Sequence, residues 1–197
     1  PQWAREIRLA ICDVTVLGAG IFGLSIAYAC ALRGANVQVL EANDVGAGSS
    51  GGLVGALAPH TPDRWNDKKQ FQFDSLIMAP DWWDGVGRLS GFDPGYVRGG
   101  RLQPLQDKRA VDLARARATD ARKNWHGLAA WEVRSEADGD WAPVSKSRMY
   151  LFDTISARLH PRQSARALGG ALRALGCSVH VKGAGTPEGK VIEATGV

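Results

Sequence analysis

The order of apolar and polar positions predicts a strand, a helix and a second strand in the N-terminal part of this sequence. Residues 13–17 form a β-branched run that ends at a glycine, as is typical of a buried strand. Residues 21–33 carry apolar side chains at helical spacing and are followed by a glycine. Residues 37–40, of which three are apolar, are predicted to form a second strand. This order predicts a right-handed βαβ unit with two parallel strands.

Similar patterns predict further elements along the rest of the chain. We expect helices over 71–86, 111–125 and 161–175, strands over 96–104, 179–181 and 190–194, and irregular or strand-like structure over 132–150. Two adjacent glycines in the third of these helices, Gly169 and Gly170, indicate close packing against another backbone. We expect Trp82, Trp83 and Trp125 to lie in the core.

The most informative motif, GAGIFG over residues 18–23, lies between the first strand and the first helix. Glu41 ends the second strand, 23 residues after Gly18. This is the context of a dinucleotide fingerprint, in which the glycines permit a tight turn, the approach of a pyrophosphate and close helix packing. The phosphates would meet free N–H groups at the positive end of the helix. Glu41 can accept hydrogen bonds from ribose hydroxyls and would repel a 2′-phosphate, which argues against NADP.

Composition and charge narrow the protein class. Apolar residues make up 45% and charged residues 22% of the 197, which is typical of a globular protein and excludes wholesale disorder. The 24 glycines cluster rather than repeat at every third position, which excludes collagen. Residues 101–123 hold seven Lys or Arg and three Asp, so the net charge of this stretch, +4, equals that of the whole sequence. We interpret this stretch as a solvated helix face rather than a nucleic-acid site.

Cysteine spacing, hydropathy and the N-terminus together predict a cytoplasmic protein. Cys12, Cys30 and Cys177 lack zinc or redox spacing, which predicts reduced thiols. Residues 14–32 contain no charge, but glycines and hydroxyls interrupt them, so we expect a buried strand, turn and helix rather than a membrane span. The first residues lack a signal-peptide pattern. Because the sequence does not begin with methionine, we expect the polypeptide to extend beyond Pro1.

A glycine- and hydroxyl-rich loop follows Glu41 and distinguishes this sequence from an ordinary NAD-binding domain. Together with the fingerprint, the sequence resembles the D-amino-acid oxidase superfamily of flavoproteins, which includes glycine oxidase and sarcosine oxidase. The resemblance rests on residues 16–25, 39–42, 49–51, 55–60, 158–161 and 191–196. It implies an α/β fold, with a Rossmann-like FAD-binding domain containing a parallel sheet over 10–62 and 156–197 and part of a β-rich substrate domain over 63–155.

The resemblance implies FAD as the cofactor, and the loop before His60 offers no Cys or His for a covalent link. It places residues 21–22 over the pyrophosphate, 41–42 at the adenosine ribose, 49–50 at phosphate or ribitol oxygens, 54–56 beside the isoalloxazine and 184–185 at the adenine. The cofactor-binding residues that it implies are Gly18, Ala19, Gly20, Ile21, Phe22, Gly23, Glu41, Ala42, Gly48, Ser49, Ser50, Val54, Gly55, Ala56, Leu57, Ala184, Gly185, Thr195 and Gly196.

The resemblance further implies an oxidoreductase that transfers a hydride from a carbon bonded to nitrogen, in an amino acid or amine, to the flavin. Three alternatives remain open: the flavin module of a tRNA wobble-uridine modifying enzyme, an FAD-binding subunit without catalysis, and an NAD enzyme. His60 is either a group near the flavin or an ordinary loop histidine. The other histidines have no metal-ligand spacing, and no metal is expected.

In this superfamily, the groups that bind the substrate carboxylate lie largely in a second half that this sequence lacks. We therefore expect a second polypeptide, or further residues of the same one, to supply them. We also expect that these 197 residues alone do not turn over an amino acid.

Overall fold

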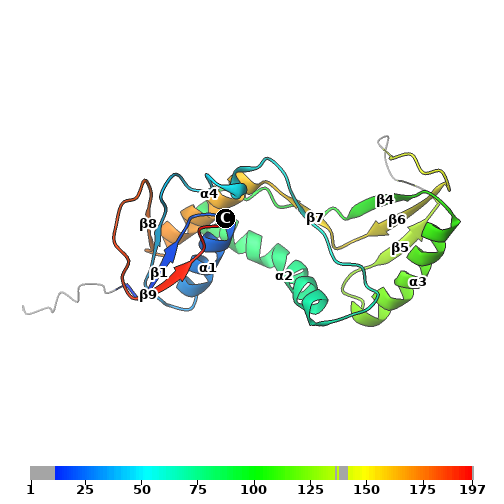
Figure 1. Ribbon diagram of the computed structural model, residues 1–197, viewed down its shortest axis with the longest axis horizontal. Helices are drawn as coiled ribbons and strands as arrows, with labels where there is room; N and C mark the ends of the chain where they lie inside the picture. The colour runs from blue at the N-terminus through cyan, green and yellow to red at the C-terminus, as the bar shows by residue number, and fades with distance from the viewer. Residues whose placement is uncertain (1–11, 136, 138–141, 197) are drawn as a thin grey trace, which may run out of the picture. The chain divides into compact units, whose positions relative to one another are not determined.

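The computed structural model describes residues 12–135, 137 and 142–196, and this part of the chain divides into two compact units (Figure 1). Unit 1 contains the described residues up to 54, residues 84–95 and those from 160 onward, and unit 2 contains residues 55–83 and the described residues of 96–159. The two units therefore interleave along the sequence. The prediction for the first residues of the chain lies outside the described residues.

The boundaries of these units differ from those expected for the two domains. Residues 84–95 lie within the expected substrate domain, 63–155, but belong to unit 1. One reason is that the hydroxyl of Ser164 donates a hydrogen bond to the carbonyl oxygen of Pro94 at 2.7 Å. A contact between residues 70 positions apart leaves no trace in local periodicity.

Unit 1 is built on a four-stranded parallel sheet. In spatial order its strands are β8 (Ser178–His180), β2 (Val37–Leu40), β1 (Val14–Leu17) and β9 (Lys190–Glu193). The helix α1 (Ile21–Ala31) joins β1 to β2 and contacts both, and α4 (Pro161–Ala174) contacts α1 and β8. Parallel strands joined by helical crossovers confirm the predicted α/β fold class.

The core of unit 1 lies between its sheet and these two helices. Its buried apolar residues include Val16, Leu24, Val37, Val39, Leu168 and Leu172. The buried hydroxyl of Thr15 accepts hydrogen bonds from the side chain of Gln38 and the backbone N–H of Glu188, each at 2.9 Å. This packing fixes the turn after β1 at the carboxyl edge of the sheet, where ligands bind in open α/β folds.

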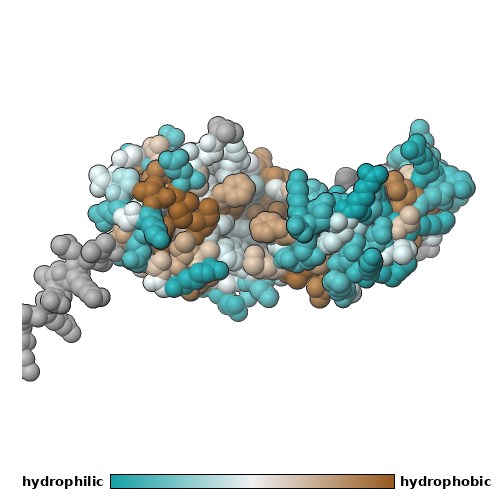
Figure 2. All heavy atoms as spheres, turned by 60° about the horizontal axis from the view of Figure 1, so that its bottom comes forward, coloured by the Kyte–Doolittle hydropathy of each residue, from teal (hydrophilic) through white to brown (hydrophobic). Residues whose placement is uncertain are grey.

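Unit 2 is built on antiparallel strands. In one sheet, β6 (Met149–Asp153) lies between β4 (Arg101–Leu105) and β5 (Trp131–Arg134), and in a second ladder β3 (Gly55–Leu57) pairs with β7 (Ala157–Leu159). The helix α3 (Lys108–Asn124) contacts all three strands of the first sheet. Its N-cap is Asp107, whose carboxylate accepts a hydrogen bond from the N–H of Ala110 at 2.7 Å. Figure 2 shows mostly hydrophilic side chains over the part of unit 2 that carries α3.

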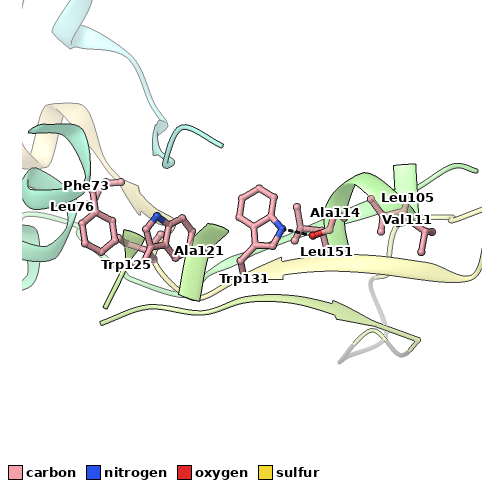
Figure 3. Close-up of a cluster of buried hydrophobic side chains, with 10 residues drawn as sticks. Phe73, Leu76, Leu105, Val111, Ala114, Ala121, Trp125, Trp131 and Leu151 are labelled. Carbon is pink, nitrogen blue, oxygen red and sulfur yellow. Dashed lines mark hydrogen bonds between the residues drawn. The ribbon is translucent and has the colours of Figure 1, made fainter. Parts of the chain in front are cut away.

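Aromatic side chains dominate the core of unit 2 (Figure 3). Trp125 is fully buried, stacks on Phe73 with ring centroids 5.6 Å apart, and contacts Trp131 edge-to-face at 5.9 Å. The indole N–H of Trp131 donates to the carbonyl oxygen of Ala114 at 3.2 Å. Trp83 is also buried, which confirms the core assignment for it and for Trp125, whereas Trp82 is half-buried.

Most of the predicted elements are present, with shifted ends. The helix α2 (Asp67–Ser90) extends beyond the predicted 71–86 at both ends. The strand predicted over 96–104 begins only at Arg101. Val97 lies outside this strand and forms an isolated bridge with Arg158. The stretch 132–150 contains most of β5 and the start of β6.

The prediction that Gly169 and Gly170 pack against another backbone is wrong. A Cβ added at Gly170 would lie 3.0 Å from the Cβ of Ser90 and 3.1 Å from the ring of Phe92, which are side-chain atoms. At Gly169, the nearest atom belongs to the side chain of Arg173 in the same helix. Gly170 therefore makes room for an aromatic ring.

The cysteines are free thiols, as predicted. Cys12 and Cys177 are buried and Cys30 is half-buried. Burial raises the pKa of the Cys177 thiol, which favours its unreactive protonated form. Among the helices of the described residues, none is long and apolar enough to cross a membrane.

Candidate nucleotide-binding site

Contacts with the chain that follows β9 fix the turn between β1 and α1. Gly18 has a φ of +102°, and a Cβ at this position would lie 2.5 Å from the carbonyl oxygen of Ala194. The N–H of Ala194 donates a hydrogen bond to the carbonyl oxygen of Leu17 at 2.8 Å. Only glycine combines this φ with such a close backbone approach. Gly18 thus brings the fingerprint turn against the second predicted turn, at Thr195 and Gly196.

Glycine is required at the other two fingerprint positions for different reasons. Gly20 is the N-cap of α1 in extended backbone, and a Cβ there would meet, among the described residues, only the Oγ of Ser50 within 4 Å, at 3.3 Å. Its backbone is therefore open to an approaching ligand. A Cβ at Gly23 would collide with the carbonyl oxygen of Gly18. Gly20 leaves space for a ligand, and Gly23 lets the helix pack on the turn.

The electrostatic potential at the start of α1 favours an anion. Its first turn contains no acidic residue, so the positive end of the helix dipole is not compensated from within the helix. The N–H of Ile21 donates to the Oγ of Ser50 at 2.9 Å. Because this hydroxyl accepts from the backbone, its own proton can be donated to a phosphate oxygen. Phe22, which follows Ile21, is 78% exposed.

Glu41 is held in place by two backbone groups. Its Oε2 accepts from the N–H of Ala19 at 2.7 Å, and its Oε1 accepts from the N–H of Asn43 at 2.8 Å. A carboxylate has about four lone-pair directions, so each oxygen can accept a further bond from a hydroxyl. The half-buried Glu41 and the exposed Ala42 thus lie where the fingerprint places a ribose.

The loop with Gly48, Ser49 and Ser50 is tied to the fingerprint turn at one end and to α4 at the other. The N–H of Gly46 donates to the carbonyl oxygen of Ala19 at 2.9 Å, and the short helix η1 (Ser49–Gly51) follows. These bonds position Ser50 against the start of α1, while Gly48 and Ser49 are exposed.

Arg162, which ties the loop to α4, was not among the residues predicted from the sequence. Its Nε donates to the carbonyl oxygen of Gly51 at 2.6 Å. Arg162 lies in the first turn of α4, where a positive charge opposes the helix dipole. An arginine at this unfavourable position is a signal in the sequence, because it indicates a side chain that contacts a group outside its own helix.

The segment predicted to meet the adenine lies beside Glu41. The N–H groups of Lys182 and Gly183 donate to the carbonyl oxygens of Asn43 and Glu41, at 2.9 and 3.0 Å. Ala184 and Gly185 follow directly, and a Cβ at Gly185 would lie 2.8 Å from the side chain of Leu40. The structure therefore brings this segment, the fingerprint, Glu41, Ser50 and the Thr195 turn together within unit 1.

The residues predicted to run beside the isoalloxazine are divided between the units. Val54 ends the first segment of unit 1 and is 79% exposed, whereas Gly55, Ala56 and Leu57 form β3 in unit 2. His60, also in unit 2, is half-buried, and its backbone N–H donates to the side chain of Gln72 at 2.6 Å. Among the described residues, no cluster of His, Cys, Asp or Glu could hold a metal ion.

The geometry of unit 1 fits a dinucleotide cofactor. An open glycine N-cap lies beside a serine hydroxyl, and a carboxylate held by a backbone amide lies at the same turn. These groups provide donors for phosphate and acceptors for hydroxyls. Groups of these kinds can bind and orient a cofactor.

Comparison with known proteins gives the same assignment. The family model described as "FAD dependent oxidoreductase" matches residues 13–186. The chain is 45% identical over 187 residues to the tRNA 5-methylaminomethyl-2-thiouridine biosynthesis bifunctional protein of Albidiferax ferrireducens, covering 77% of this chain and 30% of the relative. It is 28% identical over 180 residues to the gamma-glutamylputrescine oxidoreductase of Escherichia coli, covering 86% and 41%.

A solved structure shares the fold. The L-amino acid deaminase from Proteus myxofaciens superposes with a TM-score of 0.71 at 20% identity, covering 88% of this chain and 38% of the deaminase. The chain thus spans less than half the length of each of these three proteins.

Proposed function

The chain belongs to the FAD-dependent oxidoreductase family, and on this premise we propose that it binds FAD in unit 1 and serves the oxidation of a C–N bond in an amino acid or amine. The family is FAD-dependent, so the cofactor follows from membership. The reaction is proposed for the whole protein, because this chain spans less than half of the relatives that it matches. The amine substrate in the name of the Escherichia coli relative supports a C–N bond as the target.

The observation that carries the proposal is the open N-cap at Gly20, with Ser50 on one side and Glu41 behind the same turn. In the proposed complex, the amides at the start of α1 and the Ser50 hydroxyl donate to the pyrophosphate. The Glu41 carboxylate accepts from the ribose hydroxyls, which fixes the adenosine end. The segment from Val54 to Ala56 runs beside the isoalloxazine.

FAD supplies the chemistry of C–N oxidation, because its isoalloxazine can accept a hydride from the substrate carbon. The chain's own residues bind and orient this group, so the reaction needs few protein acids or bases. Residues that bind the substrate are proposed to come from the rest of the protein or from a second polypeptide, in addition to any that unit 2 provides.

A second candidate function is suggested by the relative from Albidiferax ferrireducens, whose name places it in tRNA modification. In that case unit 1 would bind FAD in the same way and the substrate would be a modified nucleoside. The basic stretch on α3 gives this candidate little support, since Lys108 pairs with Asp112 at 2.9 Å and Arg117 pairs with Asp63 at 3.1 Å. Salt-dependent binding of tRNA would favour the second candidate.

The FAD site is tested with two matched valine substitutions. Gly20 and Gly52 both have extended backbone that valine can adopt, but only Gly20 faces the proposed pyrophosphate. Lost amide bonds to a charged phosphate cost about 1.5–3 kcal/mol each, so Gly20→Val should weaken FAD binding at least about a hundredfold in a fluorescence titration. Gly52→Val should leave it unchanged, because its Cβ would lie 4.0 Å from Pro161. Equal affinities of Gly20→Val and the unmodified protein would contradict the proposal.

The C–N reaction is tested separately, on the whole protein loaded with FAD. Its yellow flavin absorption should bleach when it is mixed without oxygen with an amino acid or amine substrate. A panel of glycine, sarcosine, D-amino acids and polyamines covers the proposed class. If dithionite bleaches the flavin but no member of the panel does, FAD binding stands and the C–N assignment fails.

A further inference from the structure

The loop over residues 48–54, which carries the Ser50 hydroxyl, is held by few hydrogen bonds. Within the described residues, it makes two such bonds to other parts of the chain. The Oγ of Ser50 accepts from the N–H of Ile21 at 2.9 Å, and the carbonyl oxygen of Gly51 accepts from the Nε of Arg162 at 2.6 Å. Three of the seven residues of this loop are glycines. Because glycine loses more conformational freedom than any other residue when it is ordered, such a loop is costly to hold in one shape.

The first turn of α4, which carries Arg162, is a fixed support for this loop. Ser164 is fully buried in that turn, and its hydroxyl donates to the carbonyl oxygen of Pro94 at 2.7 Å. The helix also packs against α1 and against η1, which lies beside the start of α4 in Figure 1 (cyan). A Cβ at Gly52 would lie 4.0 Å from the ring of Pro161, so the loop contacts this turn directly. The bond from Arg162 therefore ties a glycine-rich loop to an anchored helix.

Arg162 is unfavourable for the helix on which it lies. The first turn of α4 contains no acidic residue, so the positive charge of Arg162 adds to the positive end of the helix dipole. A second arginine, Arg166, lies four residues further along the same helix face and adds repulsion between like charges. The benefit of Arg162 therefore lies outside its own helix, and the bond to Gly51 is the contact that provides it.

The bond to Gly51 also fixes Ser50, because the two residues are neighbours in η1. The N–H of Gly51 donates to the carbonyl oxygen of Gly48 at 2.9 Å, which closes the turn of η1. The Oγ of Ser50 then lies 3.3 Å from the position that a Cβ would take at Gly20. Arg162 on α4 thus holds the hydroxyl of Ser50 at the start of α1.

We propose that Arg162 is a positioning residue of the cofactor site. Its hydrogen bond to Gly51 keeps η1 ordered, and so keeps the Ser50 hydroxyl where it can donate to the FAD pyrophosphate. This role rests on the proposed function, because it requires FAD in unit 1. Without the bond, FAD would have to order the loop as it binds, and ordering the backbone of a single residue lowers affinity by about fivefold or more.

Arg162→Met tests this role, since methionine keeps part of the apolar stem but cannot donate to Gly51. FAD affinity should fall by about fivefold or more in a fluorescence titration. The matched control, Arg166→Met, removes the same charge one turn later on α4, where the guanidinium lies 4.2 Å from the ring centroid of Phe92. It should change FAD affinity by less than about twofold, because an exposed charge at this distance is screened. Both arginines are exposed, so neither substitution should lower the unfolding temperature markedly.

A double-mutant cycle with Ser50→Ala separates positioning from other effects of the arginine. If Arg162 acts through Ser50, Arg162→Met should weaken FAD binding by less than about twofold once the Ser50 hydroxyl is gone. Two losses of affinity that multiply in the double variant would overturn the proposed route through Ser50. A loss in Arg162→Met that disappears at high salt would show that the charge attracts FAD directly, and this would also overturn the positioning role.

Hydrogen exchange of the Ile21 amide follows the loop without FAD, because this amide donates to Ser50. The amide should exchange about fivefold faster or more in Arg162→Met, and at an unchanged rate in Arg166→Met. Equal exchange in Arg162→Met and the unmodified protein would overturn the proposal. If Ile21 responds as expected but the unmodified protein does not bind FAD, the positioning of Ser50 by Arg162 stands and the proposed function fails. If FAD binds and the two arginine variants behave alike, the reverse holds.

Discussion

The candidate site of unit 1 and the pocket of unit 2 are formed by different kinds of groups. In unit 1, the groups that would meet a ligand are mainly backbone amides at the start of α1, and glycines keep them accessible. In unit 2, a pocket of about 250 Å³ is lined by residues from segments that are distant in sequence, among them Arg101, Ser156 and Arg158. A site made of backbone is damaged by adding atoms, whereas a site made of side chains is damaged by removing them.

The two units also differ in the packing that supports these sites. Unit 1 packs small and branched aliphatic residues between helices and a parallel sheet, while unit 2 depends on a cluster of aromatic rings around Trp125. The former distributes its stability over many small contacts. The latter concentrates stability in a few large side chains, so the two units should respond differently to single truncations.

The largest expected effect breaks the aromatic core of unit 2. Trp125 is fully buried between Phe73 and Trp131, so Trp125→Ala should lower the free energy of unfolding by about 3–5 kcal/mol. Chemical denaturation followed by circular dichroism measures this loss. The control is Leu128→Ala, which truncates a side chain that is 60% exposed and should cost less than about 0.5 kcal/mol. Similar losses in the two variants would show that the aromatic cluster is not the main support of unit 2.

A smaller effect is expected from the side chain that contributes most to the backbone-built site. Glu41→Gln keeps the size of Glu41 but replaces a charge-assisted hydrogen bond from Ala19 by a neutral one. FAD binding should weaken by about tenfold, or about 1.4 kcal/mol, in the same titration as for Gly20→Val. Glu132→Gln, on β5 in unit 2, should leave the affinity unchanged. If Glu41→Gln has no effect either, the carboxylate does not contribute to the site.

The smallest effect concerns an ion pair of unit 2 and its dependence on pH. Burial raises the pKa of Asp63, but hydrogen bonds from Thr61 and Arg117 and the charge of Arg117 outweigh it, so the pKa lies below its usual value. The folded state therefore releases the proton more readily than the unfolded chain. The resulting stability is present above the unfolded pKa of about 3.9 and is lost as the pH falls through the folded pKa.

We expect this contribution to be no more than about 1 kcal/mol, since both side chains are partly exposed. Urea denaturation of the unmodified protein and of Asp63→Asn, at neutral pH and near pH 3, measures it. The stability difference between the two proteins should shrink at the lower pH. A difference that is independent of pH would mean that the loss comes from packing rather than from charge.

The fingerprint and its context were predictable from the sequence because each glycine is required by a local backbone geometry. Gly18 needs a positive φ, and Gly23 lets α1 pack on the turn, so their spacing encodes the shape of the turn directly. The strands β1 and β2 were equally predictable, because each has three apolar side chains in four positions, as is typical of buried strands in a parallel sheet.

The side-chain pocket of unit 2 was not predictable in this way. Arg101 contacts Asp153 only because the antiparallel pairing of β4 with β6 puts these two residues opposite each other. No spacing in the sequence encodes that register. The placement of residues 84–95 in unit 1 and the contact of Arg162 with Gly51 depend in the same way on long-range packing.

The contact of Gly18 with Ala194 also has a consequence for how this protein is made. The central strand β1 ends at Leu17, but one of its two neighbours, β9, follows only after residue 189. At about 5–20 residues per second, translation leaves β1 without that neighbour for roughly 10 seconds or more. Non-local pairings of this kind also slow folding, because a long loop must close before the contact forms. The cofactor turn is therefore completed only after β9 has been synthesised, and until then one edge of β1 is open to other chains.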